Sequence, residues 1–326
     1  MADGRYAGAS VLVTGAQGFI GSWLAERLLG EGARVVVPRR DVPAESRFRL
    51  DGLESRCDVV EADVLDHQAL VRIVNEYEVG TVFHLAAQTI VGTANRSPLS
   101  TFETNVRGTY NLLEACRAVE GPVERIVVAS SDKAYGEHEE LPYAEDFALQ
   151  PRYPYDVSKA CTDMIARSYA ATYDMPVAVT RLANVYGGGD FNFSRVVPDT
   201  ARSLLKGERP VVRSDGTPER DFIYVEDAVE AYLAVADSLE RAELRGRAWN
   251  AGAGEPVQVI EIVRRLIAAS GRELEPDIQG EGTPHGEIDR QYLDSTAIRE
   301  ELGWSPTWDL ERGLRETYAW YERALG

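Results

Sequence analysis

The stretch Ser10-Val-Leu-Val-Thr-Gly15-Ala-Gln-Gly18-Phe-Ile-Gly21 combines a short apolar strand, a turn with three glycines and the start of a helix. Beyond it, Ile20, Leu24 and Leu28 repeat at the spacing of one helical face. Glycines in such a turn let the backbone approach a pyrophosphate and let the helix pack closely on the strand, while the helix N-terminus favours negative charge. The stretch therefore predicts the dinucleotide-binding turn of an α/β fold.

Strand and helix patterns alternate regularly after this turn. Further strands are expected at residues 33–38, 57–61, 81–85, 125–130 and 177–181, and helices at residues 65–77, 101–118 and 156–172. Repeated alternation implies a parallel sheet covered by helices, with its ligand at the carboxyl ends of the strands. The expected fold class is α/β, a Rossmann-type doubly wound parallel sheet.

The regular pattern ends at Asn184-Val-Tyr-Gly187-Gly188-Gly189-Asp190, where three glycines follow one another. We predict a dinucleotide-binding lobe over residues 1–182 and a smaller C-terminal α/β substrate lobe over residues 183–326, some segments of which return to the first lobe. Helices of the second lobe are expected near residues 198–205, 225–237, 257–269, 294–302 and 310–324, and strands near residues 211 and 222.

The composition is that of a globular protein of enzyme size, with 326 residues of which 44% are hydrophobic and 27% charged. A formal charge of -18, from 53 acidic and 35 basic residues, opposes nonspecific binding to nucleic acid. Four scattered histidines give no metal-ligand spacing, and no apolar run reaches the ~20 residues of a membrane helix. We expect no metal and no nucleic-acid or membrane partner.

The cysteines and one histidine are predicted to be packing residues. Cys57, Cys116 and Cys161 are widely spaced in apolar or helical contexts, which is typical of a reducing compartment. His84 lies within an expected strand and is interpreted as a core histidine. Residues 1–8 lack the apolar region of a signal peptide, so a cytoplasmic location is expected.

The choice between NAD and NADP depends on the end of the second strand. An acid there would bind the ribose hydroxyls of NAD, but Arg39 and Arg40 stand in its place and can accommodate a 2′-phosphate. Asp41 follows and can reach the ribose in a shifted loop, and two solvated arginines are the remaining interpretation. Asp63, after the third strand, is expected to meet the adenine edge. The small residues 86–87 leave room for a dinucleotide across the strand ends.

A second group of polar residues lies in Ser130-Ser-Asp-Lys-Ala-Tyr135 and in Tyr155-Asp-Val-Ser-Lys159. If the chain is helical from residue 156, Tyr155 and Lys159 are one turn apart and face the same side. A lysine ammonium beside a phenol favours the phenolate, which lowers the tyrosine pKa and lets it accept a proton from a sugar hydroxyl. Ser131 can share that proton. The pair by itself also fits an ordinary exposed helix start.

Four motifs in order identify a resemblance: Gly15-x-x-Gly18-x-x-Gly21, His84-Leu-Ala-Ala87, Tyr155-x-x-x-Lys159 and Arg220-Asp-Phe-Ile-Tyr-Val-Glu-Asp227. With them, nearly the whole chain resembles the extended short-chain dehydrogenases/reductases that act on nucleotide sugars. That family holds a dinucleotide that takes a hydride from sugar C4 and later returns it.

Within the family, the stretches 84–91, 130–135 and 184–190 most resemble the CDP-glucose 4,6-dehydratases. Two features follow other patterns: Ile20 stands where these enzymes often carry a lysine, and Arg220-Asp-Phe-Ile-Tyr has the general family form. The nucleotide base of the substrate therefore stays open.

The resemblance implies catalytic roles residue by residue. Tyr155 would remove the C4 hydroxyl proton, Lys159 would assist it and bind the nicotinamide ribose, and Ser131 would orient C4. Asp132 would protonate the departing C6 hydroxyl. Most 4,6-dehydratases then carry a glutamate for the C5 proton, whereas Lys133 stands here, as in the CDP-glucose enzymes.

The predicted contacts form two sets. The cofactor set comprises Gly15, Gln17, Gly18, Phe19, Ile20, Gly21, Arg39, Arg40, Asp63, Val64, Leu85, Ala86, Ala87, Tyr155 and Lys159. The substrate set comprises Gln88, Asn184, Val197, Arg213, Arg220 and Arg290. By the resemblance, Asn184, Arg220 and Arg290 hold the sugar diphosphate, and Val197 and Arg213 border the base. A fork of guanidinium donors matches a diphosphate.

The sequence thus predicts an NAD-dependent nucleotide-sugar 4,6-dehydratase with a CDP-glucose-like substrate, with NADP as the other possible cofactor. A nucleotide-sugar 4-epimerase and a non-catalytic dinucleotide-sensing protein are the alternatives. A homodimer is expected through helices 101–118 and 156–172, as the resemblance implies. Apolar residues lie on more than one face of these helices, namely Leu112, Leu113, Met164, Ile165 and Tyr169.

Overall fold

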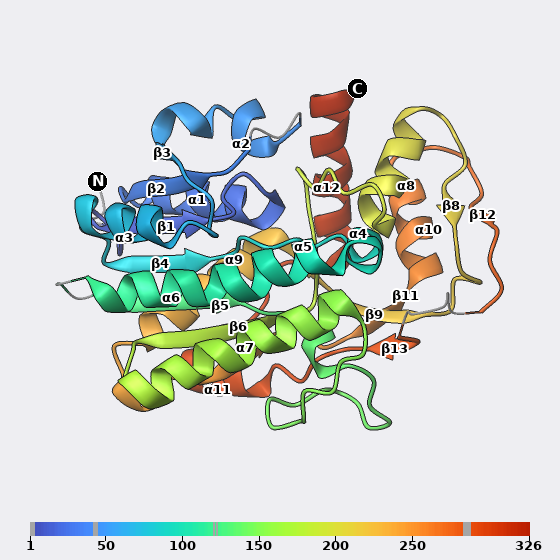
Figure 1. Cartoon of the computed structure of the whole chain (residues 1–326). Helices are drawn as coiled ribbons and strands as arrows, with labels where there is room; N and C mark the ends of the chain where they lie inside the picture. Colours follow the sequence, from blue (N-terminus) through green and yellow to red (C-terminus); the bar gives the residue numbers. More distant parts are fainter. Residues whose placement is uncertain (1–3, 42–44, 120, 122, 283–287) are drawn as a thin grey trace.

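The computed structural model describes residues 4–41, 45–119, 121, 123–282 and 288–326. Its centre is a seven-stranded sheet in the order β10-β6-β5-β4-β1-β2-β3 (Figure 1), in which every neighbouring pair is parallel. The strands are β1 (Ser10–Thr14), β2 (Arg34–Arg39), β3 (Asp58–Glu61), β4 (Thr81–His84), β5 (Arg125–Ala129), β6 (Val177–Leu182) and β10 (Ala248–Ala251). The predicted α/β doubly wound fold is confirmed.

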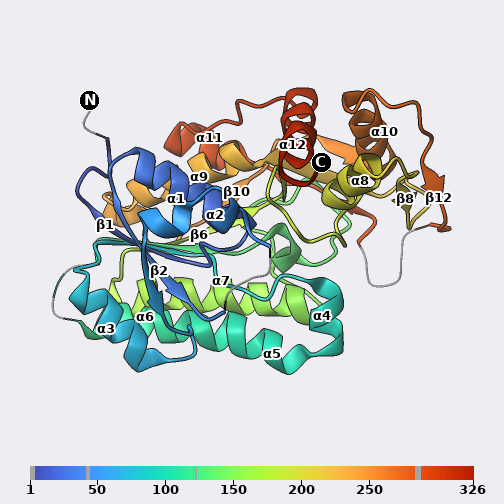
Figure 2. The same ribbon diagram turned by 90° about the horizontal axis from the view of Figure 1, so that it is seen from above.

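Helices cover both faces of this sheet, which explains why its strands are apolar runs rather than alternating patterns. One face carries α1 (Phe19–Gly30) and α9 (Val225–Ser238), and the other carries α3 (His67–Glu76), α6 (Gly108–Ala118) and α7 (Pro154–Tyr173), as Figure 2 shows. Successive residues of one strand therefore belong to different cores. Val11 and Val13 pack in the core on the α1 side, and Leu12 packs in the core on the α6 side.

The helix predicted at 101–118 is interrupted. α5 (Pro98–Phe102) continues into a π-helical turn, Glu103–Arg107, before α6 begins. Within this turn the buried Asn105 side chain accepts a hydrogen bond from the Gln88 N–H (2.7 Å) and donates to Ser158 Oγ (2.8 Å). Such turns occur mostly at functional sites. Here the turn ties the chain after β4 to helix α7.

The chain after residue 183 contributes to both lobes. Strand β10 and helix α9 complete the first sheet, while β7 (Asn184–Tyr186), β9 (Glu219–Tyr224), β11 (Pro256–Gln258) and β13 (Arg290–Gln291) form a second sheet. A third, two-stranded sheet joins β8 (Val211–Val212) to β12 (Asp277–Ile278). The remaining helices are α2 (Arg47–Leu50), α4 (Val91–Arg96), α8 (Val196–Leu205), α10 (Val259–Ala269), α11 (Thr296–Leu302) and α12 (Leu310–Leu325), with short turns at Leu53–Arg56, Asp132–Tyr135 and Ala242–Leu244.

Of the residues predicted to pack, His84 and Cys116 are buried, while Cys57 and Cys161 are partly buried. His84 is buried between Thr14 Oγ1 (2.8 Å) and Thr109 Oγ1 (3.0 Å), and burial lowers its pKa to about 3. Burial raises the pKa of the Cys57 and Cys116 thiols to about 11 and about 12. Among the helices of the described residues, none combines the length and apolar character needed to cross a membrane.

Candidate active site

A cleft of about 1260 Å³ runs from the glycine turn after β1 to the second lobe. It lies at the carboxyl ends of the parallel strands, where open α/β sheets bind their ligands. Of the predicted residues, it brings together Gly15, Gln17, Gly18, Phe19, Ile20, Gly21, Arg40, Asp63, Val64, Leu85, Ala86, Ala87, Ser131, Asp132, Lys133, Tyr155, Lys159, Asn184, Val197, Arg213 and Arg220.

The glycine turn has the shape of a pyrophosphate cradle. Gly15 has φ +74°, and a Cβ there would lie 2.7 Å from the Ala86 nitrogen, so only glycine fits between β1 and the chain after β4. A Cβ on Gly21 would clash with the Gly15 carbonyl, because α1 packs directly on the turn. The N-cap residue of α1 is Gly18, which has no side chain to cap the helix, so the first N–H groups of α1 suit an anion. These features fit a dinucleotide.

The two arginines at the end of β2, Arg39 as its last residue and Arg40 after it, face different ways. Arg40 lines the cleft, whereas Arg39 is not among the described residues that do. Arg39 pairs instead with Glu54 and with Glu61, whose Oε1 lies 2.8 Å from Arg39 Nε. Successive residues of a strand point to opposite sides, so only one of the two can face the ligand. The structure thus does not bring Arg39 to the predicted cofactor site.

Tyr155 and Lys159 both lie in the first turns of α7 and line the cleft. The Lys159 ammonium donates to the Ala129 carbonyl at the end of β5, and burial lowers its pKa to about 8 against the opposing charge of Asp163. Burial also raises the pKa of the Tyr155 phenol, and the charge of Asp132 adds to this. The Tyr155 pKa therefore moves opposite to the sequence prediction, because burial dominates and the Ala129 carbonyl holds the Lys159 ammonium.

Two groups oppose the rise in the Tyr155 pKa. The charge of Arg195 and a hydrogen bond with Ser131 both lower it. Arg195 lines the cleft, donates to Asp190 Oδ2 (2.7 Å) and the Val185 carbonyl (2.9 Å), and was missed from the sequence. Its position as a basic residue immediately before helix α8, after the glycine-rich loop, was the available signal.

Asp132 is a buried acid at the beginning of the turn Asp132–Tyr135. Only 3% of its surface is exposed, and burial raises the pKa of its carboxyl, opposed by the Lys133 charge and a hydrogen bond from Ser131 Oγ (2.9 Å). Within the part of the chain that the structure describes, the Asp132 Oδ2 atom accepts no hydrogen bond. Desolvation stabilises the neutral acid, which is the form that can donate a proton.

The substrate end of the cleft contains polar groups from several elements. The amide nitrogen of Asn184 is buried in the cleft and has no hydrogen-bond partner among the described residues. Arg220 is also buried and donates to the Asp289 carbonyl (3.0 Å), while Arg213 is largely exposed and donates to Asp199 Oδ2 (2.9 Å). The Asn184 amide is thus a donor for an anionic ligand at this end, and the two arginines bring positive charge to it.

Two predicted substrate contacts, Arg290 and Gln88, are not among the described residues that line the cleft. Arg290 is on β13, and its half-exposed side chain pairs with Glu219 on the neighbouring strand β9, where Nε lies 2.7 Å from Oε2. The Gln88 side chain folds back and accepts a hydrogen bond from the Ile90 N–H (2.8 Å). Each of these side chains has a local polar partner, and neither residue is among the described residues that line the cleft, so the structure does not bring these two to the predicted site.

Residues 12–317 match the family model of GDP-mannose 4,6 dehydratase. The chain is 31% identical to a CDP-glucose 4,6-dehydratase of Salmonella typhimurium, over 97% of this chain and 91% of that enzyme. It is also 31% identical, over 98% of its length, to a trifunctional UDP-glucose 4,6-dehydratase, epimerase and reductase of Arabidopsis thaliana. The chain spans only 48% of that longer protein.

Solved structures with the same fold include both dehydratases and epimerases. The dTDP-glucose 4,6-dehydratase of Bacillus anthracis in complex with NAD has a TM-score of 0.84 and 27% identity, with 97% of each chain covered. A UDP-glucuronic acid 4-epimerase of Bacillus cereus, in complex with UDP-glucuronic acid and NAD, has a TM-score of 0.85 and 25% identity over 96% of this chain and 99% of that one. This chain therefore belongs to the GDP-mannose 4,6 dehydratase family, within the extended short-chain dehydrogenases/reductases that comprise nucleotide-sugar dehydratases and epimerases.

Proposed function

We propose that this protein is an NAD-dependent nucleotide-sugar 4,6-dehydratase, which converts a nucleoside-diphosphate hexose into water and the 4-keto-6-deoxy sugar. The observation that carries the proposal is Asp132, a buried carboxyl with a raised pKa in the same cleft as Tyr155 and Lys159. A 4-epimerase needs a base at C4 but no acid beside C6. The dehydratase relative from Salmonella typhimurium, similar over nearly its full length, supports the same choice.

NAD bound along the glycine turn would supply the hydride acceptor for sugar C4 and the hydride donor for C6. Tyr155 takes the proton of the C4 hydroxyl, and Ser131, which is hydrogen-bonded to it, orients that hydroxyl. The charge of Arg195 favours the phenolate that this step requires. Lys159, whose ammonium donates to the Ala129 carbonyl, is assigned to the nicotinamide ribose. Because the Lys159 pKa is about 8, the lysine keeps most of its charge at neutral pH.

The loss of water needs one acid and one base. Asp132, whose neutral form burial favours, gives its proton to the departing C6 hydroxyl as the C5–H bond breaks. Lys133 lines the same cleft and takes the position where most 4,6-dehydratases have a glutamate, so we assign it the C5 proton. A lysine accepts a proton only in its neutral form. The proposal includes transfer of the C5 proton to Lys133 through a bound water.

The substrate is a nucleotide sugar of the CDP-glucose type. Asn184 and Arg220 bind its diphosphate, because a buried amide donor and a guanidinium fork both match phosphate oxygens. Val197 and Arg213 border the base. The predicted NAD contacts are kept, except for Arg39, and the substrate contacts are kept, except for Arg290 and Gln88.

Product analysis in deuterated water tests the proposal. CDP-, UDP-, GDP- and dTDP-glucose are each incubated with the protein and NAD, and we expect a 4-keto-6-deoxy product with deuterium at C5. A C4 epimer without solvent deuterium would instead identify the 4-epimerase represented by the Bacillus cereus neighbour. Dinucleotide binding without conversion of any nucleotide sugar would favour the sensing protein.

We also propose a homodimer through α5, α6 and α7. Leu112 and Leu113, two residues on which the prediction depended, are buried within the chain itself. Two other apolar residues of these helices are exposed, Leu99 on α5 (73%) and Met164 on α7 (60%). Light scattering at micromolar concentration should give a dimer mass, and Met164→Glu should lower it. A monomer mass for the unmodified protein would contradict the proposal.

A further inference from the structure

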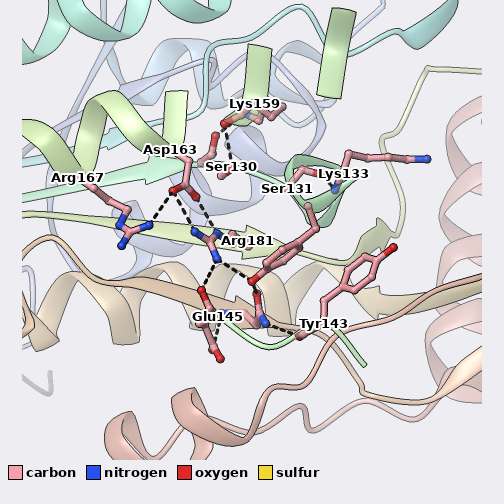
Figure 3. A network of polar contacts seen from close by, with 12 residues as sticks. Ser130, Ser131, Lys133, Tyr143, Glu145, Lys159, Asp163, Arg167 and Arg181 are labelled. Atoms are coloured by element: carbon pink, nitrogen blue, oxygen red, sulfur yellow. Dashed lines mark hydrogen bonds and ion pairs between the residues drawn. The ribbon is translucent and has the colours of Figure 1, made fainter. Parts of the chain in front are cut away.

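A fully buried ion pair lies behind the catalytic helix. Asp163 is on α7, one turn after Lys159, and Arg181 is on β6, with side-chain exposures of 0% and 1%. Their contact is bidentate, with Arg181 Nε 2.8 Å from one carboxylate oxygen and Nη2 3.1 Å from the other (Figure 3). Two parallel hydrogen bonds fix orientation as well as distance. The pair therefore holds helix α7 on the sheet.

The same guanidinium also holds the turn that carries Ser131, Asp132 and Lys133. Its remaining nitrogen, Nη1, donates to the Tyr135 hydroxyl (2.7 Å) and to the Glu145 carbonyl (3.0 Å). Tyr135 is the last residue of that turn, and its hydroxyl donates in turn to Asn250 Oδ1 (2.7 Å) on β10. One arginine thus joins two segments that are far apart in sequence.

A buried ion pair contributes little net stability, because the cost of removing both charges from water offsets their attraction. What such a pair can supply is a defined geometry. The three residues of this chain of contacts, Asp163, Arg181 and Tyr135, are not among the described residues that line the cleft. Any role they have in the reaction is therefore exerted through the residues that line the cleft.

We propose that the contacts Asp163–Arg181–Tyr135 form a positioning device that holds Tyr155 and Lys159 on the helix in register with Ser131 and Asp132 on the turn. This inference rests on the proposed dehydratase function, in which the C4 base Tyr155 is on the helix, the groups for water loss are on the turn, and Ser131 at the start of the turn assists the C4 step. Removing the hydrogen bond between Arg181 and the Tyr135 hydroxyl leaves the Asp163–Arg181 pair intact. This change should make the turn more mobile and leave the position of the helix unchanged.

Tyr135→Phe makes this cut with little risk to folding, since the ring and its contact with the Arg181 guanidinium (4.8 Å) stay in place. We expect water loss to slow about tenfold, because small displacements of a proton donor are costly. C4 oxidation should slow by no more than about twofold, because its base stays on α7 and it uses the turn only through Ser131, at the end opposite Tyr135. Single-turnover measurements should then show reduced cofactor accumulating before product forms. Tyr6→Phe is the matched control, as Tyr6 is fully buried and donates to Asp237 (3.2 Å) away from the cleft.

Two further measurements separate positioning from general damage. In an Asp132→Asn background, Tyr135→Phe should add less than about twofold, because a residue that acts through Asp132 has nothing left to act on. Amide hydrogen exchange should speed up at residues 131–136 in Tyr135→Phe and stay unchanged along α7.

Each outcome decides one question. Equal slowing of both steps, an effect no larger than that of Tyr6→Phe, additivity with Asp132→Asn, or unchanged exchange at residues 131–136 would overturn the positioning role. The exchange measurement needs no substrate, so it judges the positioning role even if the unmodified protein dehydrates none of the four nucleotide sugars. That last result would refute the proposed function instead.

Discussion

The two ends of the cleft are formed by different kinds of groups. At the cofactor end, the shape comes from backbone and small residues, and a single added Cβ on Gly15 would collide with the chain after β4. At the substrate end, the shape comes from long side chains that already hold partners, such as Arg213 with Asp199 and Arg195 with Asp190. The first end is rigid and specific for one shape. At the substrate end the side chains must exchange partners when an anion binds. Substitutions there should therefore weaken substrate binding by smaller steps.

The largest effect is expected where the two ends meet, at Asp132. Asp132→Asn keeps the shape but removes the acid, and loss of general acid catalysis typically costs ~10²- to 10⁴-fold. C4 oxidation should persist, so reduced cofactor should build up and be measurable by absorbance. The raised pKa of Asp132 means that water loss in the unmodified enzyme should fall as pH rises through that pKa, since the neutral acid disappears. An Asp132→Asn enzyme with normal product formation would exclude this residue as the acid.

The rigid end should respond to its smallest possible change. Gly15→Ala adds one methyl group at φ +74°, against the Ala86 nitrogen, and we expect about a 100-fold loss of NAD affinity from strain and clash together. Gly30→Ala in α1 is the control, because no atom lies within 4 Å of its added Cβ. Calorimetric titration with NAD compares the two. Similar affinities for both variants would show that the cradle is not rigid.

The substrate end should respond less sharply. Arg220→Gln keeps a polar side chain but removes the charge, and we expect KM for the nucleotide sugar to rise about tenfold with NAD affinity unchanged, as is typical of a lost charged hydrogen bond. Arg290→Gln, whose guanidinium pairs with Glu219 outside the cleft, should leave KM within about twofold. Steady-state kinetics separates them, and a larger effect of Arg290→Gln would reverse the assignment.

The smallest effect, on the preference between NADP and NAD, is expected from the two arginines at the end of β2. Arg40→Ser should lower the ratio of NADP to NAD affinity, because Arg40 lines the cleft. The expected decrease is only about threefold, because Arg40 is already paired with Asp41 (2.6 Å). Arg39→Ser should leave that ratio unchanged, since Arg39 faces Glu54 and Glu61. Competition binding with both cofactors measures the ratio. An Arg40→Ser substitution that weakens NADP and NAD binding equally would show that Arg40 does not read the 2′-phosphate.

Features that depend on neighbouring residues could be predicted from the sequence. The order of strands and helices follows from apolar patterns, and the glycine turn follows from three glycines between a strand and a helix. The placement of Tyr155 and Lys159 follows from helical spacing alone. The interrupted helix at 101–118 could not be predicted, because its π-helical turn is held by Asn105 through contacts with Gln88 and Ser158.

By itself, the sequence determined the sheet, the glycine turn and the two polar segments that line the cleft, because strand propensity, glycine conformation and helical spacing are local properties. Only the tertiary structure decided which charges face the ligand. Arg40 faces the cleft and Arg39 does not, burial gives Asp132 a raised pKa, and Arg181 joins Asp163 to Tyr135. Side-chain direction, desolvation and ion pairing depend on partners that are distant in the chain, and no local pattern records which partners will meet.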